Sequence, residues 1–292
     1  MDLSILILSF NTSQTTQECL SSIYKTLEGA SFSFEVIVLD NKSEDSSVED
    51  INRKFPQVKL IESSVNLGFG KGNNELVKHA KSDILLFLNS DIIVLSDAIQ
   101  DLYDFYTKNQ KEYGFVGGKL FNKDKTPQYS AAPFFTIPVV FAVHFLRGDY
   151  WGFTRYSPNK ITSVDWVSGA CFITKKNIFN EVGGFDEKIF MYMEEVDLMY
   201  RGRLKGYKTG FYPDAHFIHY GSLSSNGRSE PILNVYGGFL YFYKKHHGAG
   251  ALFMLKLLLW LKAAVAYSIG VVVRNSYLTK TYEKALELVQ NA

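Results

Sequence analysis

Short runs of apolar residues recur through the first 120 residues of the chain and alternate with longer polar segments. Four runs cover residues 3–8, 35–39, 58–61 and 84–88, and residues 115–118 form a weaker fifth. Short runs rich in Val, Ile and Leu are typical of strands that are buried on both faces of a sheet. The pattern therefore predicts a series of buried strands.

The polar segments between these runs are expected to form helices. They cover residues 13–28, 43–54, 69–81 and 96–109. In the last segment, apolar residues recur every three to four positions behind Ser96, a residue type that favours helix N-caps. Strands that alternate with helices predict an α/β fold in which helices cover both faces of a parallel sheet.

The candidate functional residues are those directly after the apolar runs, because parallel sheets bind ligands beyond the carboxyl ends of their strands. The residues there are small, polar or acidic. They form four motifs, Ser9-Phe10-Asn11-Thr12, Asp40-Asn41, Asn66-Leu67-Gly68-Phe69-Gly70 and Asn89-Ser90-Asp91. The fold should bring these motifs to one edge of the sheet, although they are far apart in the sequence.

Each of these motifs has a purely structural alternative. Asp40 could accept a hydrogen bond from a ribose or a base, or it could cap the next helix through an Asx turn. The glycine-rich loop 66–74 could bring backbone N–H groups to a phosphate, or it could be a plain strand-to-helix turn. Asp91 could bind a divalent cation together with a diphosphate, or it could be a capping residue before the helix at Ser96.

Three carboxylates crowd into four positions at Glu194, Glu195 and Asp197. Acids favour a helix N-terminus, and Asp197 has the spacing to pair with Arg201 one helical turn later. These structural roles account for Glu195 least well, because it falls off the face that Asp197 shares with Arg201. A carboxylate at the edge of an apolar pocket can act as a general base, so this stretch suggests catalysis. His219 could ligate a metal or could be a hydrogen-bonded core residue.

The C-terminal segment differs from the rest of the chain in charge and hydropathy. From residue 236 onward the net charge is +5, whereas the whole chain carries +1. Residues 250–273 are apolar apart from Lys256 and Lys262, and are long enough to span a bilayer. A spanning orientation would place Lys262 near the bilayer centre, which costs about 3 kcal/mol of insertion free energy. A helix that lies in the membrane interface is therefore favoured. The alternative is a core helix or a subunit interface, such as that of a homodimer.

Composition excludes several other classes of protein. With 46% hydrophobic and 21% charged residues the chain is globular. Its two cysteines, Cys19 and Cys171, form no disulfide framework, which fits a reducing compartment. A dinucleotide-dependent oxidoreductase would need a Gly-x-Gly-x-x-Gly turn after the first strand, and residues 9–12 contain no glycine. We expect no nucleic-acid partner.

Taken together, these motifs resemble the family 2 inverting glycosyltransferases of the GT-A fold, especially the bacterial rhamnosyltransferase-like members. The resemblance covers about residues 3–225 and includes Trp166-Val167-Ser168-Gly169-Ala170 and Gly184-Phe185-Asp186-Glu187. It implies a mostly parallel central sheet with helices on both faces, followed by C-terminal helices. The expected division is a glycosyltransferase domain at 1–235 and a helical, basic, membrane-associating tail at 236–292.

The resemblance also implies a role for each motif. Glu195 occupies the base position, where the family usually has Asp, and Asp91 with His219 would hold Mg²⁺ or Mn²⁺. The donor sugar and the acceptor would lie near Trp166, Gly169, Glu194 and Asp197. The donor nucleotide would be bound by Asn11, Asp40, Asn66, Gly68, Gly70, Asn74, Asn89 and Ser90.

The implied reaction moves a sugar, expected to be rhamnose, from a dTDP or UDP donor to a hydroxyl of a lipid-linked or cell-surface polysaccharide. A base takes the hydroxyl proton, the diphosphate leaves against a metal ion, and a single displacement inverts the anomeric centre. A polyprenyl-linked acceptor would place the protein in the cytoplasm, peripheral to the inner face of the bacterial membrane. The alternative is a catalytically weak, nucleotide-sugar-binding scaffold of a glycan-assembly complex, because Glu stands in the base position.

Overall fold

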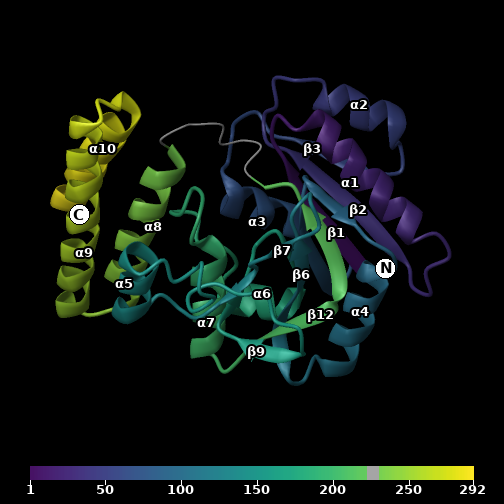
Figure 1. The fold of residues 1–292 in the computed structure, drawn as a ribbon. Helices are drawn as coiled ribbons and strands as arrows, with labels where there is room; N and C mark the ends of the chain where they lie inside the picture. Colours follow the sequence, from purple (N-terminus) through teal and green to yellow (C-terminus); the bar gives the residue numbers. More distant parts are fainter. Residues whose placement is uncertain (222–229) are drawn as a thin grey trace.

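The computed structural model describes residues 1–221 and 230–292 and is built around one large sheet (Figure 1). Its first half is parallel, with strand order β3-β2-β1-β4. The four strands are β1 (Leu3–Ser9), β2 (Phe34–Asp40), β3 (Lys59–Glu62) and β4 (Ile84–Asn89). The register sets Ser9 opposite Asp40 and Leu8 opposite Asn89, so these strands end at one edge. The apolar runs therefore form strands as the sequence predicts.

The second half of the sheet continues beyond β4 in mixed directions. The order is β4-β11-β6-β12-β5, in which β11 is antiparallel to both of its neighbours and β12 is parallel to β6. These strands are β5 (Ile92–Val94), β6 (Tyr113–Phe121), β11 (Cys171–Lys175) and β12 (Lys208–His219). Four short strands complete the β structure of the described residues, namely β7 (Pro127–Gln128), β8 (Ala131–Ala132), β9 (Thr162–Val164) and β10 (Trp166–Val167). Most of the long strands share one direction, as expected for a GT-A fold.

Helices cover both faces of the sheet, and each face has its own apolar core. Alternate residues of β1 point to opposite cores: Ile5 and Ile7 meet α1, α2 and α4, while Leu6 lies in the core of α3, α6 and α7. The bounds are α1 (Ser13–Thr26), α2 (Ser47–Lys54), α3 (Phe69–His79), α4 (Ala98–Asn109), α5 (Ile137–Phe145), α6 (Lys176–Val182) and α7 (Glu194–Leu204). The result is the predicted α/β sandwich of helix, sheet and helix.

Three further helices follow at the C-terminal end, α8 (Glu230–His246), α9 (Ala249–Val272) and α10 (Ser276–Asn291). Figure 1 shows α9 and α10 as a hairpin that lies beside α8, at the opposite side of the molecule from β1 and β2. The buried residues Tyr236, Phe239 and Phe242 of α8 belong to the same core as α7. The domain boundary expected at residue 236 therefore falls inside a helix that packs on the sheet domain.

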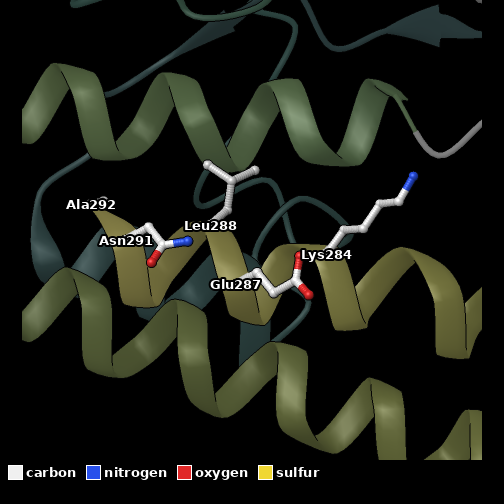
Figure 2. Close-up of a pocket in the computed structure, with 5 residues that line it drawn as sticks. All are labelled: Lys284, Glu287, Leu288, Asn291 and Ala292. Carbon is white, nitrogen blue, oxygen red and sulfur yellow. The ribbon is translucent and has the colours of Figure 1, made fainter.

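A shallow hollow of about 380 Å³ lies along α10 near the C-terminus (Figure 2). It is lined by Lys284, Glu287, Leu288, Asn291 and Ala292, and Leu288 points toward α8. The hollow is remote from the strand ends, and its lining carries one carboxylate beside one lysine. It offers no cluster of groups that would support catalysis.

Candidate active site

A cleft of about 450 Å³ opens beyond the carboxyl ends of β1 and β4. Residues from many distant parts of the chain line it, so the fold joins the strand-end motifs to the acid cluster. Ten of the residues that we predicted for the site line this cleft: Asn66, Gly68, Asn89, Ser90, Asp91, Trp166, Gly169, Glu194, Glu195 and His219. The other five, Asn11, Asp40, Gly70, Asn74 and Asp197, lie outside its lining.

Asp40 is the last residue of β2, beside the cleft. Only one of its two carboxylate oxygens has a hydrogen-bond partner within the described residues. Its Oδ2 accepts a hydrogen bond from the Ser43 backbone N at 2.8 Å. This forms a turn, but Asp40 does not cap the next helix, because α2 begins at Ser47 with Ser46 as its N-cap. Oδ1 of Asp40 is buried and has no hydrogen-bond partner within the described residues. A buried acceptor without a partner is unfavourable, so this oxygen would be stabilised by a hydrogen-bond donor.

Asn41 and Asn11 hold the loops at this end of the sheet. The Asn41 side chain donates to Oδ1 of Asn66 at 2.9 Å and accepts from the Leu67 backbone N at 2.7 Å. Asn41 lines the cleft, whereas Asn11 ties its own loop to the neighbouring one by accepting from the Glu44 backbone N at 2.7 Å. Asn41 belongs to the Asp40-Asn41 motif, but it is not among the site residues that the sequence predicts.

The glycine-rich loop packs against the segment that leads to the acid cluster. Gly68 has φ +75°, and a Cβ there would lie 2.6 Å from the carbonyl oxygen of Phe190, so only glycine fits. The Asn74 side chain forms two hydrogen bonds of 2.9 Å with the backbone of Phe185. Gly70 packs closely against the same residue, because a Cβ there would lie 3.0 Å from Cβ of Phe185. Gly70 and Asn74 therefore support the site from outside the cleft.

Asp91 and His219 meet at one side of the cleft. Oδ1 of Asp91 lies 3.3 Å from Nε2 of His219, and the other ring nitrogen of His219 is 2.7 Å from Oε1 of Gln128. Since Gln128 Oε1 can only accept, Nδ1 of His219 donates to it, and Nε2 faces Asp91. A carboxylate oxygen and an imidazole nitrogen that converge in this way fit a divalent cation.

Asp91 and His219 alone supply too few ligands to complete the coordination of a metal ion. Across residues 1–221 and 230–292, no group of three or more His, Cys, Asp or Glu side chains is gathered where a metal ion could bind. A cation at Asp91 and His219 would take its remaining ligands from the substrate and from water, as is usual for Mg²⁺ bound to phosphates.

The acid cluster begins α7, and Glu194 and Glu195 line the same cleft. Glu194 is buried and Glu195 is partly exposed, and each has an Oε2 atom without a hydrogen-bond partner in the described chain. Burial, and then the charge of Glu195, raise the pKa of Glu194 well above its usual value. Burial also raises the pKa of Glu195, against the lowering effect of nearby backbone N–H groups and Arg155. Two adjacent carboxyls with raised pKa values are well suited to proton transfer.

Three residues shape the cleft around Glu195. A Cβ on Gly169 would lie 3.5 Å from the Phe69 ring and 3.6 Å from Cβ of Glu195, so the glycine keeps this space open. The buried Trp166 donates its Nε1–H to the Pro133 carbonyl at 2.9 Å and stacks beneath the Arg155 guanidinium at 5.3 Å. Sequence reasoning missed Arg155, because it belongs to an irregular stretch without periodicity.

Asp197 lies outside the cleft in a buried ionic network. Its carboxylate accepts hydrogen bonds from Arg201 at 2.7 Å, Lys245 at 2.8 Å and His246 at 2.7 Å. Burial alone would raise its pKa, but the His246 hydrogen bond, the Arg201 charge and the Lys245 hydrogen bond lower it to about 2. The predicted pairing with Arg201 is confirmed. The structure places Asp197 outside the lining of the cleft.

The mixed sheet with this strand order is the GT-A fold, which the chain shares with solved structures. The particular family follows from the sequence comparison. The chain belongs to glycosyl transferase family 2, whose family model matches residues 4–197.

Curated relatives extend the similarity over most of the chain. The N-acetylglucosaminyl-diphospho-decaprenol L-rhamnosyltransferase of Mycobacterium tuberculosis is 25% identical over 275 residues, which cover 87% of this chain and 88% of that protein. Rhamnosyltransferase WbbL of Escherichia coli is 31% identical over 216 residues, which cover 70% of this chain and 79% of that protein.

Solved structures confirm the fold at lower identity. The mannosyltransferase PcManGT from Pyrobaculum calidifontis, in complex with GDP-Man and Mn²⁺, superposes with a TM-score of 0.58 at 14% identity, covering 99% of this chain and 85% of that one. TarS 1-349 from S. aureus gives a TM-score of 0.54 at 15% identity, covering 100% and 92% of the two chains.

Proposed function

We propose that this glycosyltransferase moves rhamnose from dTDP-rhamnose to a hydroxyl of a polyprenyl-linked glycan, with inversion at the anomeric carbon. The observation that carries the proposal is the cleft itself, which is lined both by the Glu194–Glu195 pair and by Asp91 and His219. The rhamnosyltransferase names of the two curated relatives support the choice of donor sugar.

The strand-end motifs would bind the donor. Oδ1 of Asp40 is the free acceptor that could take an N–H of thymine or uracil, and Asn66 and Gly68 would line the nucleotide position. Asp91 and His219 would hold Mg²⁺ or Mn²⁺, which would neutralise charge on the departing diphosphate. The structurally similar PcManGT forms a complex with GDP-Man and Mn²⁺, which is consistent with this assignment.

Glu195 would act as the general base on the acceptor hydroxyl. It lines the cleft, retains an unpaired oxygen, and has a pKa raised by burial, so its carboxylate is a stronger base than an exposed glutamate. Glu194, beside it, would hold a proton, which limits the buried negative charge to one. Trp166 and Gly169 would border the donor sugar and the acceptor.

The C-terminal hairpin would attach the enzyme to a membrane surface. Of the described helices, only α9 has the length and apolar composition to cross a membrane. One face of α9 packs inward through Leu255 and Leu259, whereas Phe253, Leu257 and Trp260 are exposed. A helix with one face against the protein and an exposed apolar face opposite fits the plane of a membrane interface.

Charge supports the same orientation. Residues 231–282 contain no Asp or Glu, and Lys256 and Lys262 lie at the two borders of the exposed face of α9. Lysines in these positions can reach anionic headgroups while their stems cover apolar surface. This placement would keep the enzyme at the cytoplasmic face of the membrane, where a lipid-linked acceptor would be presented. A homodimer through α9 is the competing use of this face.

The test is a transfer assay with purified full-length protein and a synthetic polyprenyl-diphosphate glycan acceptor. Donors are dTDP-rhamnose, UDP-glucose, UDP-N-acetylglucosamine and GDP-mannose, each with Mn²⁺ or EDTA. We expect transfer from dTDP-rhamnose with Mn²⁺ and an inverted linkage in the product. Tight donor binding without transfer or hydrolysis would instead support the scaffold function, and preference for another donor would overturn the assignment of rhamnose.

A further inference from the structure

The segment directly before Glu194 has a strained backbone. Tyr192 and Met193 have φ values of 69° and 77°, in the left-handed region that residues with side chains rarely adopt. Met193 is the N-cap residue of α7, and Tyr192 lines the cleft. Two consecutive left-handed residues next to a catalytic group persist only where the surrounding structure holds them.

Helix α8 supplies a close contact to this strained segment. A Cβ added to Gly238 would lie 2.8 Å from Cγ of Met193 and 3.0 Å from the carbonyl oxygen of Tyr192. The adjacent Gly237 faces open space, with no atom within 4 Å of such a Cβ. The absence of a side chain at Gly238 therefore lets α8 lie directly against the backbone that sets the direction of Glu194 and Glu195.

Residues near the C-terminal end of α8 form ion pairs and hydrogen bonds with α7 and with the segment before it. Lys245 donates to Asp197 at 2.8 Å and to Asp186 at 2.7 Å, and Tyr241 donates to Asp186 at 2.8 Å. Arg201 links Asp197 to the Gly184 carbonyl at 2.6 Å. Asp197 is fully buried, so these contacts operate away from solvent screening.

We propose that Gly238, Lys245 and Asp197 are positioning residues, through which α8 braces the start of α7 and fixes Glu195 for proton abstraction. The inference rests on the proposed role of Glu195 as the base, and it goes further by giving α8 a part in catalysis. Because α8 leads directly into α9, the same contacts connect the acid pair to the C-terminal hairpin.

The matched pair Gly238→Ala and Gly237→Ala tests this brace. Both variants add one methyl group to the same helix, but only Gly238→Ala presses on Tyr192 and Met193. We expect Gly237→Ala to keep wild-type kinetics, and Gly238→Ala to lower kcat about 10- to 100-fold with the donor KM nearly unchanged. Equal kcat values in the two variants would overturn the proposal.

Lys245 provides a second test that does not depend on the folding of Gly238→Ala. Lys245→Met keeps the length of the side chain and removes its charge, whereas Lys245→Arg keeps the charge. We expect kcat to fall in Lys245→Met and to recover largely in Lys245→Arg, without a matching change in donor KM. Wild-type kcat in Lys245→Met would contradict the brace.

Hydrogen–deuterium exchange of residues 190–197 separates this inference from the proposed reaction. The brace predicts faster exchange in Gly238→Ala than in Gly237→Ala, whether or not any donor is turned over. If the wild-type protein transfers no sugar, the proposed function fails while this comparison still decides the inference. Identical exchange in the two variants would show that α8 does not hold the segment.

Discussion

Oδ1 of Asp91 lies 3.3 Å from Nε2 of His219 because β5 and β12 pair antiparallel, with His219 opposite Ile92. The sheet therefore brings the end of the fourth apolar run next to a residue from much later in the chain. Gln128 fixes the imidazole from the other side at 2.7 Å. This orientation of His219 underlies the first prediction.

His219→Gln should weaken metal-dependent donor binding, because it removes the only nitrogen ligand proposed for the cation. We expect the Mn²⁺ concentration that gives half-maximal binding of dTDP-rhamnose to rise about 10- to 100-fold in calorimetric titrations. His216→Gln is the control, since His216 is exposed on the same strand and contacts Phe121. Donor binding that is equally tight in EDTA would exclude the metal role.

The pH dependence of kcat should report the coupled glutamates. The base must be ionised, so kcat should rise with pH through an acidic limb that lies above the usual glutamate value of 4.5. Glu194→Gln keeps a neutral group beside the base, so the limb should stay at nearly the same pH while activity persists. An acidic limb at the position of an ordinary exposed glutamate would show that burial does not tune this pair.

The raised pKa of Glu194 has a consequence for the stability of the fold. A carboxyl whose folded-state pKa is raised contributes fully below its unfolded pKa, and the contribution is lost as the pH rises through the folded value. Glu194→Gln should therefore raise the free energy of unfolding at neutral pH and change it little at low pH. Urea denaturation at both pH values measures this, and a loss of stability at neutral pH would contradict the assignment.

Gly68 and Gly29, two of the glycines with positive φ, should respond differently to alanine. Gly29 has φ +81° and no atom within 4 Å of an added Cβ, so Gly29→Ala should cost only the left-handed penalty, roughly 1–2 kcal/mol. Gly68→Ala would also collide with Phe190 at 2.6 Å, so it should lose more stability and weaken donor binding. Urea denaturation with donor titration tests both effects, and equal losses would show that the Phe190 contact yields easily.

Binding to anionic vesicles should depend on the exposed face of α9. Leu257→Glu and Trp260→Glu place acids on that face and should reduce co-sedimentation with phosphatidylglycerol vesicles, because both residues are exposed and the fold does not need them. Gln290→Glu on α10 adds the same charge at an exposed position outside that face. If the first two variants bind vesicles normally but convert a dimer to a monomer, α9 is a subunit interface.

Much of the fold could be predicted because the first four strands are continuous apolar runs with helices between them. The carboxyl ends of these strands then had to share an edge, which brought Asn66, Asn89 and Asp91 together in the cleft. Strand β12 was harder to predict, because it is long, interrupted by a register shift between Tyr212 and His216, and pairs with several strands.

The residues that sequence reasoning missed come from irregular segments. Arg155 and Gln128 reach the cleft from a stretch without helical or strand periodicity, so only tertiary contacts place them. Asp197 was expected near the substrate because of its neighbours in sequence. Its partners Lys245 and His246 lie on α8, and no local pattern could indicate that they turn it away from the cleft.

The most direct test of the account is the steady-state rate of rhamnosyl transfer by Glu195→Gln. This variant keeps the size and hydrogen-bonding capacity of the side chain but cannot accept the proton. The account predicts that kcat falls about 10²- to 10⁴-fold while calorimetric donor binding stays within about twofold of wild type. A near wild-type kcat for Glu195→Gln, with the loss appearing instead in Glu194→Gln, would contradict the assignment of the base.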